Sequence, residues 1–381
     1  MEGARGAMTA GILPGPARAG PDEPDDTGEP RRRDDASAAP QPQTADGRRH
    51  DWHAVAFARE VGDGEGAPFA TMLMGEPIVL WRSGGRLQAW LDQCPHRGAP
   101  LSCGRLKGDR LVCAYHGWEF DGTGACVHIP ALPGRPPPAG AKAHPLLAAE
   151  GSGLVWVSLG RPPHDVPRFP ECADPLFRVH QMGPYEFANA FRAIENFLDV
   201  AHFPFVHGGI IGVEANPEPV PDLSVTQDAD GLVTSEVSVF QPFGDPRGIP
   251  VQADYRYRVL RPTTACFVKR LRIADPAQAH RGKADDRLST YITVQPLDET
   301  RSLVRLSQAM NFAEEVSAED IRRRTDLIVE QDRQIVIRQR PARLPLAPGD
   351  ELHVRADRVS VAYRRWLRAL NVTYGTISTD R

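Results

Sequence analysis

The stretch from Cys94 to Trp118, CPHRGAPLSCGRLKGDRLVCAYHGW, contains the most informative residues of this chain. Two short loops in it each supply one cysteine and one histidine, and sixteen residues separate the pair Cys94 and His96 from the pair Cys113 and His116. Two thiolates and two imidazoles suit a [2Fe–2S] cluster in which two Cys hold one iron and two His hold the other. The stretch therefore predicts a cluster that relays single electrons.

The same four residues could instead form a tetrahedral Cys2His2 zinc site. Zinc sites usually take two like ligands from each loop, whereas each loop here is mixed. Glycines beside the ligands, Gly98 and Gly117 among them, also let backbone N–H groups approach bridging sulfides, which zinc does not require. Both features favour the iron–sulfur cluster.

This ligand pattern resembles the Rieske family. Rieske proteins of respiratory complexes carry an additional Cys in each ligand loop, and these two residues form a disulfide. The matching positions here, 97–99 and 114–115, contain no Cys. The resemblance covers about residues 50–160 and implies the branch found in oxygenases and their ferredoxins.

Composition bounds the remaining possibilities. The chain has 381 residues, enough for two domains, and a net charge of −4, which gives no indication of a nucleic-acid partner. No apolar run reaches the length that a membrane span requires, and the other four cysteines are scattered, so we expect a cytoplasmic protein without disulfides. Residues 1–48 are rich in Pro, Gly, Ala, Asp and Arg, which predicts a disordered tail.

The rest of the chain has two regions with different secondary-structure patterns, and together these patterns predict an α+β fold class. Residues 50–160 contain short strand-like segments, such as 77–82, 87–91 and 153–159, which predict a small antiparallel β domain. Residues 161–381 predict a helix at 189–206, then a run of strands from 224 to 310, then helices at 318–339 and 359–370. This order predicts a second domain in which helices pack against one antiparallel sheet.

A second metal site is predicted within the segment from Glu195 to His207. His202 and His207 are five residues apart among apolar and aromatic neighbours, and Pro204 between them disrupts the helical hydrogen bonds. A buried His pair is more often hydrogen-bonded in a core than bound to metal. With an electron-relay cluster in the same chain, a redox metal becomes the expected acceptor of the electrons.

Two His and one carboxylate form the facial arrangement of non-haem Fe(II) oxygenases, which leaves positions open for O2 and substrate. The third ligand follows from helical periodicity, because Asp332 shares a stripe with Ile321, Ile328 and Ile335. Glu330 and the neighbouring Asp326 project from the opposite side. The alternative for Asp332 is a salt bridge with a nearby arginine.

These positions also resemble a second signature of Rieske oxygenases, in which Glu195, Asp199, His202 and His207 match an acid, an Asp and two His. The family's third ligand is an Asp late in the catalytic domain, commonly in a Gln-Asp pair on a long helix, and Gln331-Asp332 fits. The resemblance implies a helix-grip catalytic domain and covers the chain from residue 50 onward.

Asp199 has a predicted role of its own. It lies three residues before His202, on the same face of the predicted helix, and can accept the free N–H of that imidazole. By resemblance, it bridges to a cluster histidine of a neighbouring subunit, which requires an oligomer, typically a trimer. The alternative is a local cap or salt bridge.

The sequence thus predicts the terminal oxygenase component of a multicomponent Rieske non-haem iron monooxygenase, with one [2Fe–2S] cluster and one mononuclear Fe(II) per chain. A reductase, with or without a ferredoxin, supplies NAD(P)H electrons. The substrate is expected to be apolar or aromatic, in a pocket lined by Phe197, Phe203 and Phe205. Hydroxylation, demethylation, dioxygenation, desaturation and oxidative cyclisation stay open. The alternatives are a Rieske-type electron carrier without oxygenase activity and a ligand-binding helix-grip protein with vestigial metal sites.

Overall fold

The computed structural model describes residues 49, 51–62, 66–215, 217 and 219–378. The predicted disordered tail, residues 1–48, lies outside the described residues. Within the described part of the chain, no helix is both long enough and apolar enough to cross a membrane.

The first region is built from three small antiparallel sheets, with strand orders β1-β10-β9, β2-β3-β4 and β5-β6-β7-β8. The strands are β1 (His53–Phe57), β2 (Phe69–Leu73), β3 (Glu76–Ser83), β4 (Arg86–Leu91), β5 (Arg105–Lys107), β6 (Arg110–Val112), β7 (Glu119–Phe120), β8 (Cys126–His128), β9 (Leu147–Gly151) and β10 (Leu154–Ser158). The segment 130–138 forms neither helix nor strand. The antiparallel β region that the sequence predicts is therefore present.

An aromatic core lies beneath the two cysteine loops of this region. Trp90 meets Trp81 edge to face, with ring centroids 5.0 Å apart, and Phe120 at 6.4 Å. Cys94 and Cys113 belong to the same buried cluster. Because large rings packed this way fix the backbone that carries them, the two cysteine loops are attached to a firm support.

The second region is one large antiparallel sheet with helices on one face. Its strand order is β11-β18-β17-β16-β15-β13-β12, with β14 beside β15. The strands are β11 (Arg178–Phe187), β12 (Val225–Asp228), β13 (Gly231–Thr234), β14 (Val237–Gln241), β15 (Val251–Arg261), β16 (Thr264–Ile273), β17 (Asp286–Pro296) and β18 (Ser302–Met310). The α-helices are α1 (Ala190–Leu198), α2 (Phe203–Val206), α3 (Ala318–Val336) and α4 (Arg358–Ala369).

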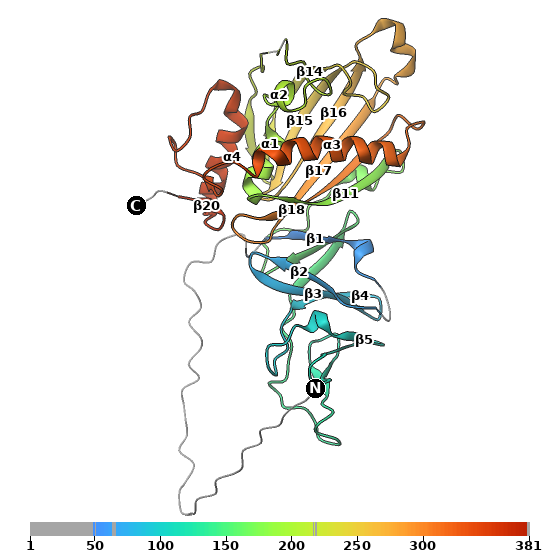
Figure 1. Cartoon of the computed structure of the whole chain (residues 1–381), viewed down its shortest axis with the longest axis vertical. Helices are drawn as coiled ribbons and strands as arrows, with labels where there is room; N and C mark the ends of the chain where they lie inside the picture. Colours follow the sequence, from blue (N-terminus) through green and yellow to red (C-terminus); the bar gives the residue numbers. More distant parts are fainter. Residues whose placement is uncertain (1–48, 50, 63–65, 216, 218, 379–381) are drawn as a thin grey trace, which may run out of the picture. The chain divides into compact units, whose positions relative to one another are not determined.

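The remaining elements are short. They are the 3-10 helices η2 (Ala58–Glu60), η3 (Leu101–Cys103), η4 (Pro170–Cys172), η5 (Pro276–Arg281) and η6 (Arg355–Asp357), and the parallel pair β19 (Leu344–Pro345) and β20 (Thr376–Ile377). Figure 1 shows α3 lying across the large sheet formed by β15, β16 and β17. The predicted α+β fold, with an all-β region followed by a sheet wrapped over a long helix, is confirmed.

Two elements differ from the sequence predictions. The helix expected at 189–206 is interrupted, because α1 ends at Leu198 and α2 begins at Phe203, one residue before Pro204. Proline fits the first turn of a helix, where its missing N–H costs nothing, so it starts α2. Strand β11 was not predicted. It alternates buried and exposed residues only irregularly and contains Gly183 and Pro184, which weaken a strand pattern.

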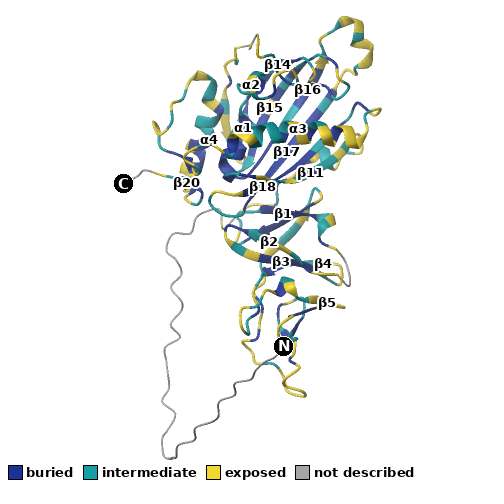
Figure 2. Cartoon of the chain, in the orientation of Figure 1, coloured by how far each residue is buried: buried dark blue, intermediate teal, exposed yellow. Residues whose placement is uncertain are grey.

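The buried face of α3 is also rotated from the predicted stripe. Its buried residues are Ile321, Thr325, Val329 and Val336, whereas Ile335 is 54% exposed. At about 100° per residue, Ile335 lies roughly 80° from the centre of this buried stripe. Including Ile335 in the inward face was wrong. Figure 2 shows buried, intermediate and exposed residues mixed along α3.

Candidate metal centres

The two cysteine loops have matching backbone conformations. In each, the N–H of the glycine four residues after the cysteine donates to that cysteine's carbonyl oxygen, at 2.9 Å for Gly98 and 3.0 Å for Gly117. Both glycines have φ near +70°, a conformation that residues with a Cβ rarely adopt. The two loops therefore turn in the same way after their cysteines.

The four side chains of these loops meet in two pairs, one of histidines and one of cysteines. The Nδ1 atoms of His96 and His116 lie 3.1 Å apart, and the imidazole of His96 stacks on Trp118 at 4.5 Å. The thiols of Cys94 and Cys113 are buried, and burial together with the neighbouring Cys113 raises the pKa of Cys94 to about 11. Two imidazole nitrogens at one point and two thiols at another fit a cluster with His ligands on one iron and Cys ligands on the other.

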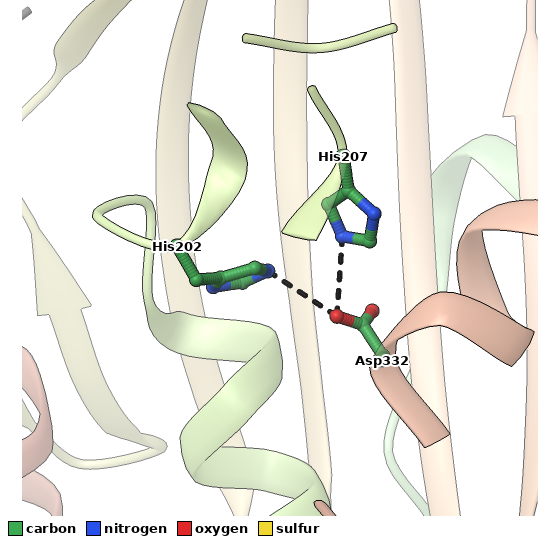
Figure 3. A group of neighbouring side chains, drawn as sticks. All are labelled: His202, His207 and Asp332. Atoms are coloured by element: carbon green, nitrogen blue, oxygen red, sulfur yellow. Dashed lines mark ion pairs between the residues drawn. The ribbon is translucent and has the colours of Figure 1, made fainter. Parts of the chain in front are cut away.

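A second group of ligands forms where α2 and α3 meet. The Nε2 atoms of His202 and His207 lie 3.3 Å and 3.1 Å from Oδ1 of Asp332, as Figure 3 shows. All three ligand atoms lie within 4.8 Å of one another. Two imidazoles and one carboxylate on one side of a point can hold an iron ion and leave further positions open.

Each of these three side chains is held by a further hydrogen bond. Oδ2 of Asp199 lies 3.1 Å from Nδ1 of His202, and Oε1 of Gln331 lies 2.9 Å from Nδ1 of His207. The amide of Asn196 donates to Oδ1 of Asp332 at 3.2 Å. Acceptors on Nδ1 keep the proton there and leave Nε2 free to bind metal.

The electrostatics of the group favour a bound cation. Burial opposes charge on the imidazole of His202, but its hydrogen bonds to Asp199 and Asp332 outweigh burial and raise its pKa to about 9. Burial also disfavours the carboxylate of Asp332, yet the two histidines hold its pKa at about 2. The carboxylates thus attract a positive charge to this place, and a metal ion would replace the proton on Nε2 of His202.

A cavity opens beside the three ligands, between α1, α2, α3 and the large sheet. It has a volume of about 150 Å³ and reaches from His202, His207 and Asp332 to the far end of α3. An apolar protein cavity of similar volume accommodates a benzene molecule. Apolar and aromatic side chains form most of its wall: Phe187, Ala193, Phe197, Phe203, Ile211, Tyr255, Tyr257, Phe267, Leu288, Ile292, Val304, Leu306, Met310, Ile321, Ile328 and Val329.

Most of the site residues predicted from sequence are brought together as expected, with two corrections. Phe197 and Phe203 line the cavity, but Phe205 is 60% exposed and does not. The short helix α2 points Phe205 away from Phe203, because residues two apart in a helix lie on different faces. Asp199 contacts His202 from the end of α1, at its C-cap, rather than from a shared helix face.

Three acidic residues near these positions have other partners. Glu195 binds Arg364 of α4 through two contacts, at 2.6 and 2.8 Å. Glu330 pairs with Arg333, and Asp326 accepts a hydrogen bond from Tyr185. Neither Glu330 nor Asp326 lines the cavity, in agreement with the predicted helix phase.

Sequence reasoning gave no role to Gln331 or Asn196. Gln331 stood next to Asp332 in the sequence, but its contact with His207 depends on how α3 lies against α2. Asn196 precedes Asp199 on α1, and nothing in its local sequence pointed to a residue 136 positions away. Both contacts exist only in the folded chain.

Comparisons with known proteins agree with this geometry. The family model described as "Rieske [2Fe-2S] domain" matches residues 51–145, and that described as "Vanillate O-demethylase oxygenase C-terminal domain" matches residues 188–372. Methylxanthine N1-demethylase NdmA of Pseudomonas putida is 31% identical over 332 residues, which are 84% of this chain and 89% of that protein. This chain belongs to the Rieske oxygenase family.

Other members agree in sequence and fold. The oxygenase component of dicamba O-demethylase from Stenotrophomonas maltophilia is 34% identical over 165 residues, 42% of this chain and 47% of that protein. The solved structure of Pseudomonas putida NdmA with caffeine superimposes with a TM-score of 0.70 at 28% identity, covering 87% of this chain and 97% of the other. The chain is thus the oxygenase component of a multicomponent system, an oxidoreductase with a [2Fe–2S] cluster and a mononuclear iron.

Proposed function

We propose that this Rieske oxygenase removes a methyl group from the nitrogen or oxygen of a small aromatic molecule. The observation that carries the proposal is the position of His202, His207 and Asp332 at one end of an aromatic-walled cavity. The named activities of the relatives, N1-demethylation of methylxanthines and O-demethylation of dicamba, support the choice of demethylation among the oxidations that such a site can perform.

The residues divide into two sets of proposed ligands. We assign Cys94, His96, Cys113 and His116 to the [2Fe–2S] cluster, on the pairing of the two histidines and of the two cysteines. We assign His202, His207 and Asp332 to the iron, which when bound supplies the activation of O2. The proposed domain limits are 50–160 for the cluster domain and 161–381 for the catalytic domain.

The cavity wall favours a flat substrate with at least one polar group. Phe197 stacks on Phe267 with ring centroids 5.2 Å apart, which leaves aromatic faces along the cavity. The hydroxyl oxygens of Tyr257 and Thr290 are buried in this wall and have no hydrogen-bond partner among the described residues. An unpaired buried hydroxyl costs about 1–3 kcal/mol. A polar substituent of the substrate would remove that cost.

The proposed reaction balances with two electrons from NAD(P)H. A methyl group on a heteroatom, O2, two electrons and two protons give the demethylated heteroatom, formaldehyde and one water. One oxygen atom enters the methyl C–H bond, and the hydroxymethyl group then leaves as formaldehyde while its proton passes to the heteroatom. Phe197 and Phe203 exclude water from this end of the cavity, and Asn196 holds the carboxylate of Asp332 in place.

Asp199 is proposed to connect the two metal centres of neighbouring subunits. Its carboxylate contacts His202 and remains 31% exposed on its other side, where it borders a polar depression with Glu195, Glu351 and His353. A cluster histidine of another chain could reach it there. This assignment implies a homo-oligomer, which we propose is a trimer, and electrons supplied by a separate NAD(P)H-dependent reductase, with or without a ferredoxin.

The alternative, an electron carrier without oxygenase activity, has no use for an aromatic-walled cavity beside three metal-ligating side chains. Iron analysis and product analysis separate the two functions. The oxygenase should contain three irons per chain and release formaldehyde from N-methyl or methoxy aromatic compounds when supplied with a reductase and NADH. Two irons per chain, with no oxygen consumed for any such compound, would favour the carrier.

A further inference from the structure

The far end of the cavity contains two cationic side chains, Lys269 of β16 and Arg324 of α3, both of which line it. Lys269 pairs in register with Tyr255 on β15 and with Leu288 on β17, so it lies in the middle of the large sheet. Lysine and arginine are seldom buried without a partner, because removing a charge from water is costly. Two cations in an otherwise aromatic cavity therefore call for an explanation.

The ammonium of Lys269 lacks an anionic partner in direct contact. It is 5% exposed and donates to Oε1 of Gln241 and to the carbonyl oxygen of Gly244, both at 3.1 Å. An ammonium carries three N–H donors, and the described residues supply these two neutral acceptors. Burial and the nearby charge of Arg324 lower the pKa of Lys269 to about 7.

Arg324 is half-buried at the same end of the cavity, and the described residues show no carboxylate in contact with it. Its guanidinium donates to the carbonyl oxygen of Phe243, in the same loop that Lys269 contacts. A guanidinium has five N–H donors, and this is the one hydrogen bond that the described residues show for it. Burial lowers the pKa of Arg324, which means that the charged form is held at a cost.

The acidic residue nearest to both cations is already paired. Asp245 is fully buried and binds Arg247, with Nη2 of Arg247 2.6 Å from its Oδ2. Arg247 also binds Asp286 at 2.8 Å. These five residues carry three positive and two negative formal charges, which leaves one positive charge without a counter-charge among them.

The spacing suits a substrate that spans the cavity. Arg324 and Asp332 are eight residues apart on α3, which places them about 12 Å apart along the helix axis. An aromatic ring with a methyl-bearing group at one end and a second substituent at the other fits between them. The aromatic wall lies between these two ends, formed by Phe267 and Tyr257.

We propose that the substrate is an aromatic carboxylate, and that Lys269 and Arg324 bind its carboxylate at the end of the cavity remote from Asp332. This inference rests on the proposed function in one respect only, namely that the substituent next to Asp332 carries the methyl group that is removed. A carboxylate fills the missing charge and offers acceptors to the free donors of both side chains. Both cations also donate hydrogen bonds to the loop at 243–244. That structural role alone does not explain why both side chains line the cavity.

The test measures binding to the holoenzyme under anaerobic conditions, by titration calorimetry without a reductase. The probes are 2-, 3- and 4-methoxybenzoate and the three corresponding methoxybenzamides, which have the same shape without the charge. We expect the tightest benzoate to bind at least about tenfold more tightly than its amide. Lys269→Met and Arg324→Met should each remove about tenfold in benzoate affinity and leave amide affinity within about threefold.

The control is Arg323→Met, which removes an exposed arginine that pairs with Asp320 on the outer side of the same helix. It should leave both affinities unchanged. Arg324→Lys, which keeps the charge, should bind benzoate more tightly than Arg324→Met does. The pair of Arg324 variants also tests the proposal if Lys269→Met does not fold. Equal affinity for acids and amides, equal loss of both in the variants, or no binding of any benzoate would overturn the proposal.

The same samples distinguish this inference from the proposed function. Supplied with reductase, NADH and O2, the enzyme should release formaldehyde from the benzoate that binds. Charge-dependent binding without formaldehyde would retain the carboxylate site and refute demethylation. Formaldehyde released from the amides as readily as from the acids would retain demethylation and refute the carboxylate site.

Discussion

The two candidate metal centres take their ligands from the chain in different ways. The cluster ligands lie within 23 residues, on two loops of similar conformation, and His116 is exposed at the surface. The iron ligands span 131 residues, come from the two ends of α2 and from α3, and border a cavity. A centre that must pass electrons needs access from outside, whereas a centre that activates O2 needs an enclosed space for its substrate.

This difference predicts that the two centres can be damaged separately. Asp332→Ala removes the carboxylate that meets both imidazoles, so we expect turnover to fall by about three orders of magnitude or more. Iron content should fall from three to two per chain while the visible spectrum of the cluster is unchanged. Metal analysis and steady-state oxygen consumption measure both quantities.

The matched control is Glu330→Ala, which removes an acid from the same helix without touching the cavity. It should retain activity and three irons. An inactive Glu330→Ala together with an active Asp332→Ala would overturn both the helix phase and the ligand assignment.

The connection between the centres is tested by Asp199→Ala. With Fe(II) supplied in excess, both metals and substrate binding should remain. Oxygenation should nevertheless fall by about two orders of magnitude, because His202 loses the acceptor that orients it and the path between subunits is broken. Rapid-mixing measurements on the pre-reduced protein should show the cluster failing to reoxidise in the presence of substrate and O2.

Asp199→Asn provides the comparison, since it keeps the shape and removes the charge. If Asp199→Ala turned over at a near-normal rate with product formation coupled to NADH, or if a monomer turned over fully, the proposed bridge would be wrong.

A smaller effect on iron binding is expected from a residue that orients a proposed ligand without binding the metal itself. Gln331→Leu removes the acceptor on Nδ1 of His207 and leaves all three proposed ligands in place. Loss of such a partner typically costs about 10- to 100-fold in metal affinity. Competition for Fe(II) with a chelator of known affinity measures this loss.

Gln334→Ala, three residues further on the exposed side of α3, is the control and should bind iron normally. Cluster content should not change in either variant. A Gln331→Leu protein with unchanged iron affinity would mean that the packing of His207, which is 1% exposed, is enough to orient it.

The smallest effect is expected at Phe205. Because Phe205 is 60% exposed and lies outside the cavity, Phe205→Ala should change stability by no more than about 0.5 kcal/mol and leave the KM for substrate nearly unchanged. Phe197→Ala, which removes a ring from the cavity wall, should raise KM clearly. Thermal unfolding and steady-state kinetics compare the two, and a larger effect at Phe205 would place the substrate elsewhere.

Local sequence was enough to predict the cluster loops, because all four residues and their glycines lie in one continuous stretch. It was also enough to place Asp332 on the inner face of α3, since helical periodicity is a property of the backbone. The same periodicity failed for Ile335, because the burial of a stripe depends on where the sheet lies, and this is not a local property.

The tertiary structure decided everything that joins distant segments. The contacts of Gln331 with His207 and of Asn196 with Asp332 arise only when α3 packs against α1 and α2. The placing of Lys269 and Arg324 at one end of the cavity likewise depends on α3 crossing β16. A sequence determines which chemical groups are available and the faces they occupy on each element, whereas the packing of elements determines which groups meet.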